Sequence, residues 1–458
     1  MPIPLIGYLI NLPSSRVYEY CTFTNIHIYI PLIILLCFLK KCFSGVNNKA
    51  DRRFNGSVFL VTGGTSGIGA EVVEELAKRG AHIILLVRSS SDSWTIDYIN
   101  DLRVRTNNQM IYAETCNLSS LYSVRQFATK WIDNVPPRRL DMVICCAGVM
   151  LPPFKPKLVT EDGIELHWGV NYLAHFHLLN LIFPALRSQP PGRDVRVIVI
   201  TCPIYIYGDL DLTDLEFHRR GYPSSCPWKC FGASKIALMN FVIEFQSRLS
   251  NCKEKDGLPN NVRCYVVDPG FVRSHMMLRF LSFGTLWGLF LYIFMWPFWY
   301  IVLKSCKQGA QSLLYCLMSS ECGTGQGGKL VVKCSLRDIK MKRYINSDIS
   351  SRLWKITETY IMEIEKREAI KQDELKMQSL SRVFGVSEPI RRKMELKIID
   401  SEFVPSVFGG SSNIHRDILI GNDSSIDIDE IFSADYHCFV DFHNELEENS
   451  AFINMESC

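Results

Sequence analysis

Short, uninterrupted apolar segments recur along the chain from residue 58 onward, and segments with helical periodicity separate them. The strand-length segments are Val58 to Val61, His82 to Val87, Met110 to Ala113, Met142 to Cys146, Val195 to Thr201, Val262 to Val267 and Gly328 to Lys333. The helical segments between them include Gly67 to Lys78, Val170 to Leu186 and Ala233 to Leu249. A strand that is apolar throughout is buried on both faces, as in a parallel sheet covered by helices on both sides. The sequence therefore predicts an α/β fold with a doubly wound parallel sheet.

The sequence TGGTSGIG at residues 62 to 69 joins the first of these strands to the first helix. Gly63 permits a tight turn, while Gly67 and Gly69 let the backbone approach a pyrophosphate and let the helix pack on the strand. The N-terminus of that helix presents free N–H groups and its dipole to phosphates. This spacing, between a strand and a helix, predicts a Rossmann-type dinucleotide site. The residues predicted to contact the cofactor in this turn are Gly63, Thr65, Ser66, Gly67, Ile68 and Gly69.

Further motifs follow in a fixed order along the same part of the chain. They are CCAGVM at Cys145 to Met150, GVNYLAHF at Gly169 to Phe176, FGASK at Phe231 to Lys235, DPGFVRS at Asp268 to Ser274 and GAQ at Gly309 to Gln311. With TGGTSGIG, they make the chain resemble the short-chain dehydrogenases/reductases, closest to the retinol-dehydrogenase-like branch and its X-linked dehydrogenase/reductase relatives. The resemblance extends from about Val58 to Trp354. It implies a Rossmann domain that transfers a hydride between a nicotinamide cofactor and a carbonyl or alcohol.

The end of the second strand bears on the choice of cofactor. An acidic residue there would bind a ribose 2′-hydroxyl, whereas apolar Val87 followed by Arg88 suits a 2′-phosphate, and the resemblance also implies NADP(H). The alternative is an ordinary solvated arginine. Asn117 stands where the family usually has an aspartate against the adenine, and Ser274 where a hydroxyl contacts the nicotinamide carboxamide. The remaining cofactor contacts implied by the resemblance are Ala147, Gly148, Lys235, Pro269 and Gly270.

The family carries out its chemistry with an Asn, a Ser, a Tyr and a Lys, and this chain departs from that set. Asn171 and Lys235 match this set. The resemblance implies that Asn171 holds a water in the proton relay and that Lys235 binds the nicotinamide ribose of the cofactor. The Tyr position is Phe231, which has no proton to donate, and the Ser position is Cys202. Cys145 and Cys146 replace two asparagines, as either a redox pair or two small buried apolar residues.

Two functional hypotheses follow from this altered set. The first is an NADP(H)-dependent oxidoreductase with atypical or weak catalysis, whose proton comes from another group. Tyr205, Tyr207 and Tyr222 lie nearby in sequence, and Cys202 is itself ionisable. The second is a catalytically inactive relative that binds NADP(H) as a membrane-associated scaffold or sensor. An intact phosphate turn with a degraded catalytic set favours the second, and membership of an enzyme family favours the first.

Two apolar segments predict contact with a membrane. Ile26 to Leu39 is followed by Lys40 and Lys41, which predicts an N-terminal anchor with the domain on the cytosolic side, and we expect the endoplasmic reticulum membrane. The alternative is a buried N-terminal helix. Phe280 to Leu303 has no charged residue, but a single crossing would separate the last strand from its sheet. An interfacial or re-entrant hairpin bent near Pro297 is therefore predicted, as a lid for a retinoid, steroid, polyprenoid or similar apolar substrate. The alternative is a lid packed only on protein.

The composition limits the remaining possibilities. The net charge of +3 is spread along the chain, which gives no case for a nucleic-acid partner. The 17 cysteines contain no CxxC pair, so neither a metal site nor a disulfide framework is predicted. We predict an N-terminal segment over 1–50, the dinucleotide domain over 51–372 with its lid at 276–304, and a tail over 373–458. The tail is acidic at its end and is predicted to be largely disordered, with an unknown partner.

Overall fold

The computed structural model describes residues 23–133, 139–190, 192–251, 261–339 and 344–384, with a few positions between 387 and 397. One eight-stranded sheet of order β3-β2-β1-β4-β5-β6-β7-β8 forms its centre. Its strands are β1 (Val58–Thr62), β2 (His82–Val87), β3 (Ile111–Thr115), β4 (Met142–Cys145), β5 (Val195–Ile200), β6 (Val262–Asp268), β7 (Lys329–Val332) and β8 (Ser335–Arg337). Neighbouring strands run parallel except β7 and β8, so the doubly wound parallel sheet is confirmed, with an antiparallel edge that the sequence did not predict.

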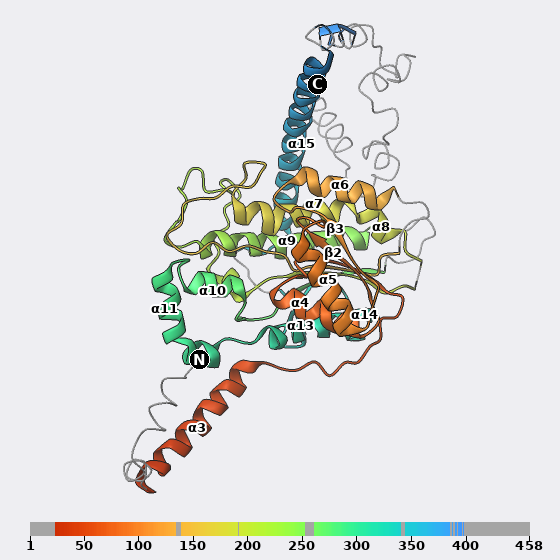
Figure 1. Ribbon diagram of the computed structural model, residues 1–458. Coiled ribbons are helices and arrows are strands. Elements are labelled where there is room, and N and C mark those ends of the chain that lie inside the picture. The colour runs from red at the N-terminus through yellow and green to blue at the C-terminus, as the bar shows by residue number, and fades with distance from the viewer. Residues whose placement is uncertain are drawn as a thin grey trace, which may run out of the picture.

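Helices cover both faces of this sheet (Figure 1). One face carries α4 (Gly67–Lys78), α5 (Ser93–Thr106) and α13 (Cys306–Met318), and the other carries α6 (Leu121–Ile132), α7 (Ala174–Leu181) and α9 (Trp228–Asn251). The central strands β1 and β5 are buried at every position, which explains their uninterrupted apolar sequences. Two apolar cores result, one on each side of the sheet.

The helix predicted over residues 170 to 186 is divided into three parts. A π-helical turn, η1 (Trp168–Leu173), leads into α7, and α8 (Phe183–Arg187) follows with Pro184 in its first turn. Proline lacks the N–H that a continuous helix needs, so the break falls just before it. The π-helical turn contains Asn171 and had no signal in the sequence.

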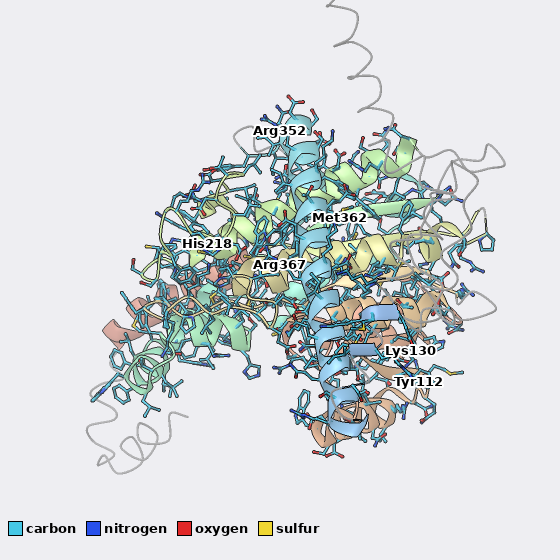
Figure 2. All side chains as sticks on the ribbon, turned by 90° about the horizontal axis from the view of Figure 1, so that it is seen from above. Tyr112, Lys130, His218, Arg352, Met362 and Arg367 are labelled. Atoms are coloured by element: carbon cyan, nitrogen blue, oxygen red, sulfur yellow. The ribbon has the colours of Figure 1, made fainter. Side chains whose placement is uncertain are left out.

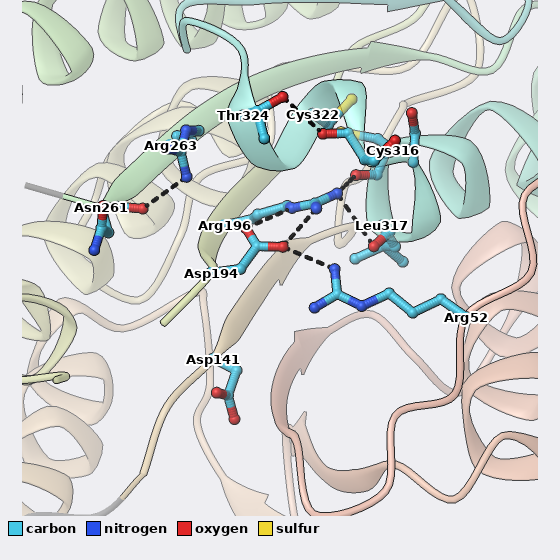
Figure 3. A network of polar contacts seen from close by, with 12 residues as sticks. Arg52, Asp141, Asp194, Arg196, Asn261, Arg263, Cys316, Leu317, Cys322 and Thr324 are labelled. Atoms are coloured by element: carbon cyan, nitrogen blue, oxygen red, sulfur yellow. Dashed lines mark hydrogen bonds and ion pairs between the residues drawn. The ribbon is translucent and has the colours of Figure 1, made fainter. Parts of the chain in front are cut away.

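A buried arginine network fixes the segment before β1 onto the domain (Figure 3). Arg196 is 1 % exposed, and its guanidinium pairs with Asp194 at 2.5 Å and donates to the backbone oxygens of Cys316 at 2.6 Å and Leu317 at 3.2 Å. Asp194 also accepts from Arg52 at 2.7 Å. The β5 strand, α13 and the incoming chain are therefore joined through one satisfied ionic cluster.

The second apolar segment forms three short helices, α10 (His275–Leu281), α11 (Leu286–Phe294) and α12 (Trp296–Val302). Pro297 lies in the first turn of α12, just after a break in the helix at Met295, and the interfacial hairpin predicted there stays a prediction. The chain then returns to the same sheet, where β7 pairs with β6. Within the described residues, no single helix has the length and apolarity to cross a membrane; α10 and α11 together have both, but they are bent by 105°.

The N-terminal apolar segment forms α3 (Phe23–Ser44), which extends away from the domain (Figure 1). At the other end, α15 (Ser347–Phe384) packs on α9 through buried residues such as Trp354 and Ile361, and turns Met362 and Arg367 outward (Figure 2). The helix continues past residue 372, where we placed the domain end, because no glycine or proline occurs before residue 385. The prediction for the acidic end of the tail lies outside the described residues.

Candidate active site

A cavity of about 730 Å³ opens at the carboxyl ends of the parallel strands. Its centre is the junction of β1 and β4, which pair in the sheet although they are not consecutive in the chain. Doubly wound sheets bind ligands at such a switch point. The predicted site residues in the cavity wall are Gly63, Thr65, Ser66, Gly67, Ile68, Arg88, Asn117, Ala147, Gly148, Cys202, Phe231, Lys235, Pro269, Gly270 and Ser274. The other two predicted site residues, Gly69 and Asn171, are not in this wall.

The glycines of the first turn are required by close backbone approach. A Cβ atom on Gly63 would lie 2.7 Å from the backbone of Ala147, and one on Gly69 would lie 2.2 Å from the carbonyl oxygen of Gly63. Gly63 and Gly67 also have positive φ angles of 67° and 61°. Ser66 precedes α4 without capping it through its side chain, so its hydroxyl and the first N–H groups of α4 stay open to an anion. These features fit the pyrophosphate of a dinucleotide.

Arg88 and Asn117 lie at the ends of β2 and β3, on the same side of the glycine turn. Arg88 is exposed and makes no ion pair with any described residue, so its guanidinium is available to a ligand phosphate. The Asn117 amide donates to Glu161 at 2.7 Å and accepts from the N–H of Ser119 at 3.1 Å, which leaves one N–H for an adenine.

The opposite end of the cavity holds the altered catalytic set. Lys235 follows Phe231 by one turn of α9, and its Nζ lies 5.6 Å from the centre of the Phe231 ring. Both side chains are buried, and Lys235 donates to the carbonyl oxygen of Ile200 at 2.9 Å. Burial lowers the pKa of Lys235 and raises the pKa of Cys202 to about 12. The structure therefore brings Lys235, Phe231 and Cys202 together in one cavity wall, and their roles stay predictions.

The Asn171 side chain holds the loop that follows β4. Its Oδ1 accepts from the N–H of Val149 at 2.7 Å, and its Nδ2 donates to the Val149 oxygen at 3.0 Å and to Ser234 Oγ at 3.3 Å. These contacts give Asn171 a positioning role, and the relay role that the resemblance implies stays a prediction. Ser274 lies in the cavity wall, and its hydroxyl also caps α10 by accepting from the N–H of Met277.

His175 lies outside the cavity wall but supports it, a role that sequence reasoning missed although the residue lies inside a quoted motif. Its Nε2 lies 3.0 Å from Thr62 Oγ1, and its Nδ1 lies 3.0 Å from the carbonyl oxygen of Asn171. Thr62 Oγ1 also accepts from the N–H groups of Cys146 and Ala147 at 3.1 Å. Burial lowers the pKa of His175 to about 4, so the ring is neutral: the Thr62 hydroxyl donates to Nε2, and Nδ1–H donates to Asn171. This chain of bonds connects β1, β4 and the π-helical turn.

The tyrosines considered as alternative proton donors do not reach the cavity. Tyr205, Tyr207 and Tyr222 are all absent from its wall. Tyr207 is 66 % exposed, and burial raises the pKa of Tyr222. Sequence reasoning passed over Thr201, which lies in the wall with a buried Oγ1 that has no hydrogen-bond partner among the described residues. A buried hydroxyl of this kind is open to a ligand.

An apolar cluster forms the wall beside Phe231. Met150, Ile204 and Phe231 are buried together, and Met276 and Phe280 of α10 pack against them. The adjacent Cys145 and Cys146 are free thiols, and burial raises the pKa of both, which favours small apolar residues over a redox pair. This end of the cavity is therefore apolar, and residues of α10 form part of its wall.

The fold and the cavity define a Rossmann-type dinucleotide-binding protein, and the comparisons give its family. A family model described as short chain dehydrogenase matches residues 57–205. The chain is 41 % identical over 368 residues to an uncharacterized oxidoreductase of Schizosaccharomyces pombe, covering 80 % of this chain and 97 % of the relative. It is 30 % identical to retinol dehydrogenase 12 of Mus musculus, covering 70 % of this chain and 90 % of the relative. It is also 32 % identical to the polyprenol dehydrogenase of Homo sapiens, with coverages of 53 % and 68 %.

The chain therefore belongs to the short-chain dehydrogenases/reductases, in the branch that contains retinol dehydrogenases. The resemblance stated from the sequence motifs is confirmed. A second family model, described as proteasome maturation factor UMP1, matches residues 355–450. That match begins within α15 and lies mainly outside the described residues.

Proposed function

We propose that this protein is an NADP(H)-dependent oxidoreductase that interconverts a carbonyl and an alcohol on an apolar, lipid-like substrate. The observation that carries the proposal is the continuous cavity, with the phosphate turn and Arg88 at one end and Lys235 beside an apolar wall at the other. The cofactor supplies or accepts the hydride. Retinol and polyprenol are lipid alcohols, and the relatives named for them support this substrate class.

Lys235 is the residue that best fits the role of proton donor. When a hydride adds to a carbonyl carbon, the oxygen must receive a proton, and Phe231 cannot supply one. The protic side chains that the end of β5 and α9 bring to this part of the wall are Lys235, Cys202 and Thr201. Cys202 is a weak acid, because burial raises its pKa to about 12. Burial instead lowers the pKa of Lys235, which makes its ammonium a stronger acid than an exposed lysine.

The substrate class can be tested by measuring NADPH oxidation with saturated and polyunsaturated aldehydes of increasing chain length. We expect kcat/KM to rise with each methylene that reaches the apolar wall, because burial of one methylene contributes about 0.8 kcal/mol. Water-soluble hydroxylated aldehydes of equal length serve as controls. Equal kcat/KM values for the short, long and hydroxylated compounds would contradict a lipid-like substrate.

A second candidate function is the binding of NADP(H) without turnover, as in a catalytically inactive member of the family. The specific observation behind it is that Phe231 and Cys202 occupy the catalytic end of the cavity, while the phosphate turn keeps its glycines. Such a protein would act as a membrane-associated scaffold or sensor. Saturable NADPH binding without turnover of any apolar carbonyl would favour this second function.

We also propose that the protein attaches to a membrane, that of the endoplasmic reticulum, with its domain on the cytosolic side. Residues 30 to 38 of α3 are all exposed, and Lys40 and Lys41 follow them. Asn55-Gly-Ser and Asn117-Leu-Ser are glycosylation triplets. The Asn117 side chain bonds to Glu161 and to the N–H of Ser119, so a glycan there would disturb the fold, and triplets that are not glycosylated fit a domain on the cytosolic side.

Protease treatment of sealed microsomes should therefore digest the domain without detergent, while a lumenal marker protein stays intact. The expected digestion follows from the positively charged flank of α3, which holds the domain on the cytosolic side. A domain that is protected until detergent is added, or that carries a glycan on Asn55 or Asn117, would show that the orientation is reversed.

A further inference from the structure

Two cations share one aromatic surface at the junction of α3 and α12. The guanidinium of Arg273, which precedes α10, lies 5.2 Å from the ring centre of Tyr300 and 5.7 Å from that of Trp296. The ammonium of Lys40, near the end of α3, lies 4.5 Å from the Tyr300 ring centre. Cations over aromatic faces are attracted to the rings, but two cations at one ring repel each other.

Neither cation is neutralised by an acidic side chain of the described residues. Lys40 donates to the backbone oxygens of Tyr300 at 2.5 Å and Leu303 at 3.4 Å, both at the end of α12. Burial, and then the charge of Arg273, lower the pKa of Lys40. Arg273 has a buried Nη1 with no hydrogen-bond partner among the described residues. An anion beside Arg273 would accept this open donor and offset the repulsion.

The surface around the two cations is apolar and exposed. On α11, Leu286 and Trp287 are each 85 % exposed, and Phe294 is 74 % exposed. Helix α12 contacts α3, and Figure 1 shows α3 and α11 on the same side of the domain. An apolar face that carries tryptophans and two half-buried cations matches the boundary between lipid headgroups and acyl chains. A soluble anion would not require an exposed apolar surface around its binding site.

We propose that Arg273 and Lys40 bind the phosphate of an anionic phospholipid at the bilayer surface. The guanidinium suits a phosphate because two of its N–H groups can donate to two phosphate oxygens. This site rests on the membrane attachment proposed above and adds the class of lipid headgroup that the attached protein binds. Val272 and Ser274, on either side of Arg273, line the cavity, so a lipid bound here would hold this side of the cavity at the membrane. An apolar substrate could then enter without crossing water.

The headgroup site can be tested apart from bilayer attachment with dihexanoyl phosphatidic acid, kept below its critical micelle concentration. Its binding to the full chain is followed by tryptophan fluorescence, since Trp296 lies against Arg273. We expect saturable binding that weakens at least about tenfold in Arg273→Gln. Arg273→Lys should also weaken binding, because it keeps the charge but loses the paired donors. Lys41→Gln, which removes an exposed charge next to Lys40, is the matched control and should bind like the wild type.

Two results would overturn this site. One is equal affinity for dihexanoyl phosphatidylcholine and dihexanoyl phosphatidic acid, and the other is an equal loss of affinity in Lys41→Gln and Arg273→Gln. Full competition by inorganic phosphate at an equal concentration would assign the site to a free anion and would also overturn the lipid. Thermal unfolding midpoints of the variants must match the wild type, and Arg273→Lys serves if Arg273→Gln does not fold.

Flotation with vesicles separates this proposal from the membrane attachment on which it rests. The full chain is mixed with vesicles of phosphatidylcholine alone or with added phosphatidylserine. We expect the wild type to bind both kinds of vesicle and to bind the anionic vesicles several-fold more. The Arg273→Gln variant should lose most of this preference for anionic vesicles. Binding that is equal for both vesicles and all variants would refute the headgroup site while the attachment stands. No binding to either vesicle would refute the attachment itself.

Discussion

Phe231→Tyr combined with Cys202→Ser should raise NADPH-dependent reduction of an apolar carbonyl by at least about tenfold. The Phe231 ring already lies in the cavity wall, with the Lys235 ammonium 5.6 Å from its centre. A phenol at this position would have a nearby positive charge that lowers its pKa from about 10 towards working pH. The serine hydroxyl would orient the carbonyl oxygen, which the buried Cys202 thiol does poorly. Steady-state kinetics of the wild type, both single variants and the double variant measure the gain.

Phe231→Leu with Cys202→Ser is the matched control for this rescue, because it changes the same positions without adding the phenol. It should show no gain. A double Tyr and Ser variant that folds, binds NADPH and turns over no faster than the wild type would contradict the expected rescue. Measurable wild-type turnover would then support Lys235 or another group as the donor, and absent wild-type turnover would support the binding protein.

Arg88→Ala should weaken NADPH binding by about 10- to 100-fold and leave NADH binding nearly unchanged. The side chain is exposed at the end of β2, in the cavity wall, with no ion pair to a described residue. Charge-assisted hydrogen bonds to a phosphate are worth about 1.5–3 kcal/mol, and only NADPH carries a 2′-phosphate. Fluorescence titration with both cofactors gives the dissociation constants.

Arg352→Ala is a suitable control for this measurement, because Arg352 is an exposed arginine on α15 outside the cavity wall. It should leave both affinities unchanged. Equal affinity of the wild type for NADH and NADPH would contradict the assignment to NADP(H), and Arg88 would then be an ordinary solvated arginine.

The sheet was predictable because its buried strands have short, uninterrupted apolar sequences. All five residues of β1 are buried, and a run of this length between turns is typical of a strand covered on both faces. The predicted bounds of β2 and α4 agree with the structure. The antiparallel β8 could not be predicted, because three partly exposed residues carry no periodic pattern. The π-helical turn around Asn171 could not be predicted either, because a helix with one wider turn has the same apolar composition as a regular α-helix.

The site residues that belong to ordered motifs were predictable, because the motif fixes their position in the fold. Residues in loops were not predictable, because the direction of the side chain decides whether they face the cavity. Gly63, Arg88 and Lys235 all face the cavity because strand ends and the α9 helix place them there. The three tyrosines near Cys202 in sequence were a poor choice, since proximity along the chain says nothing about which way a loop residue points. Thr201 is adjacent to Cys202, and only the structure shows that its hydroxyl is buried without a hydrogen-bond partner among the described residues.

The most direct test of the central claim is NADPH binding and NADPH-dependent reduction of apolar carbonyls, measured on the same preparation of the full chain. The assignment predicts saturable NADPH binding and slow but measurable reduction that is lost in Lys235→Met, while thermal unfolding is unchanged. Binding without any turnover would contradict the oxidoreductase and support the scaffold or sensor. Failure to bind either NADPH or NADH would contradict both functions, because both depend on the cavity that begins at the glycine turn.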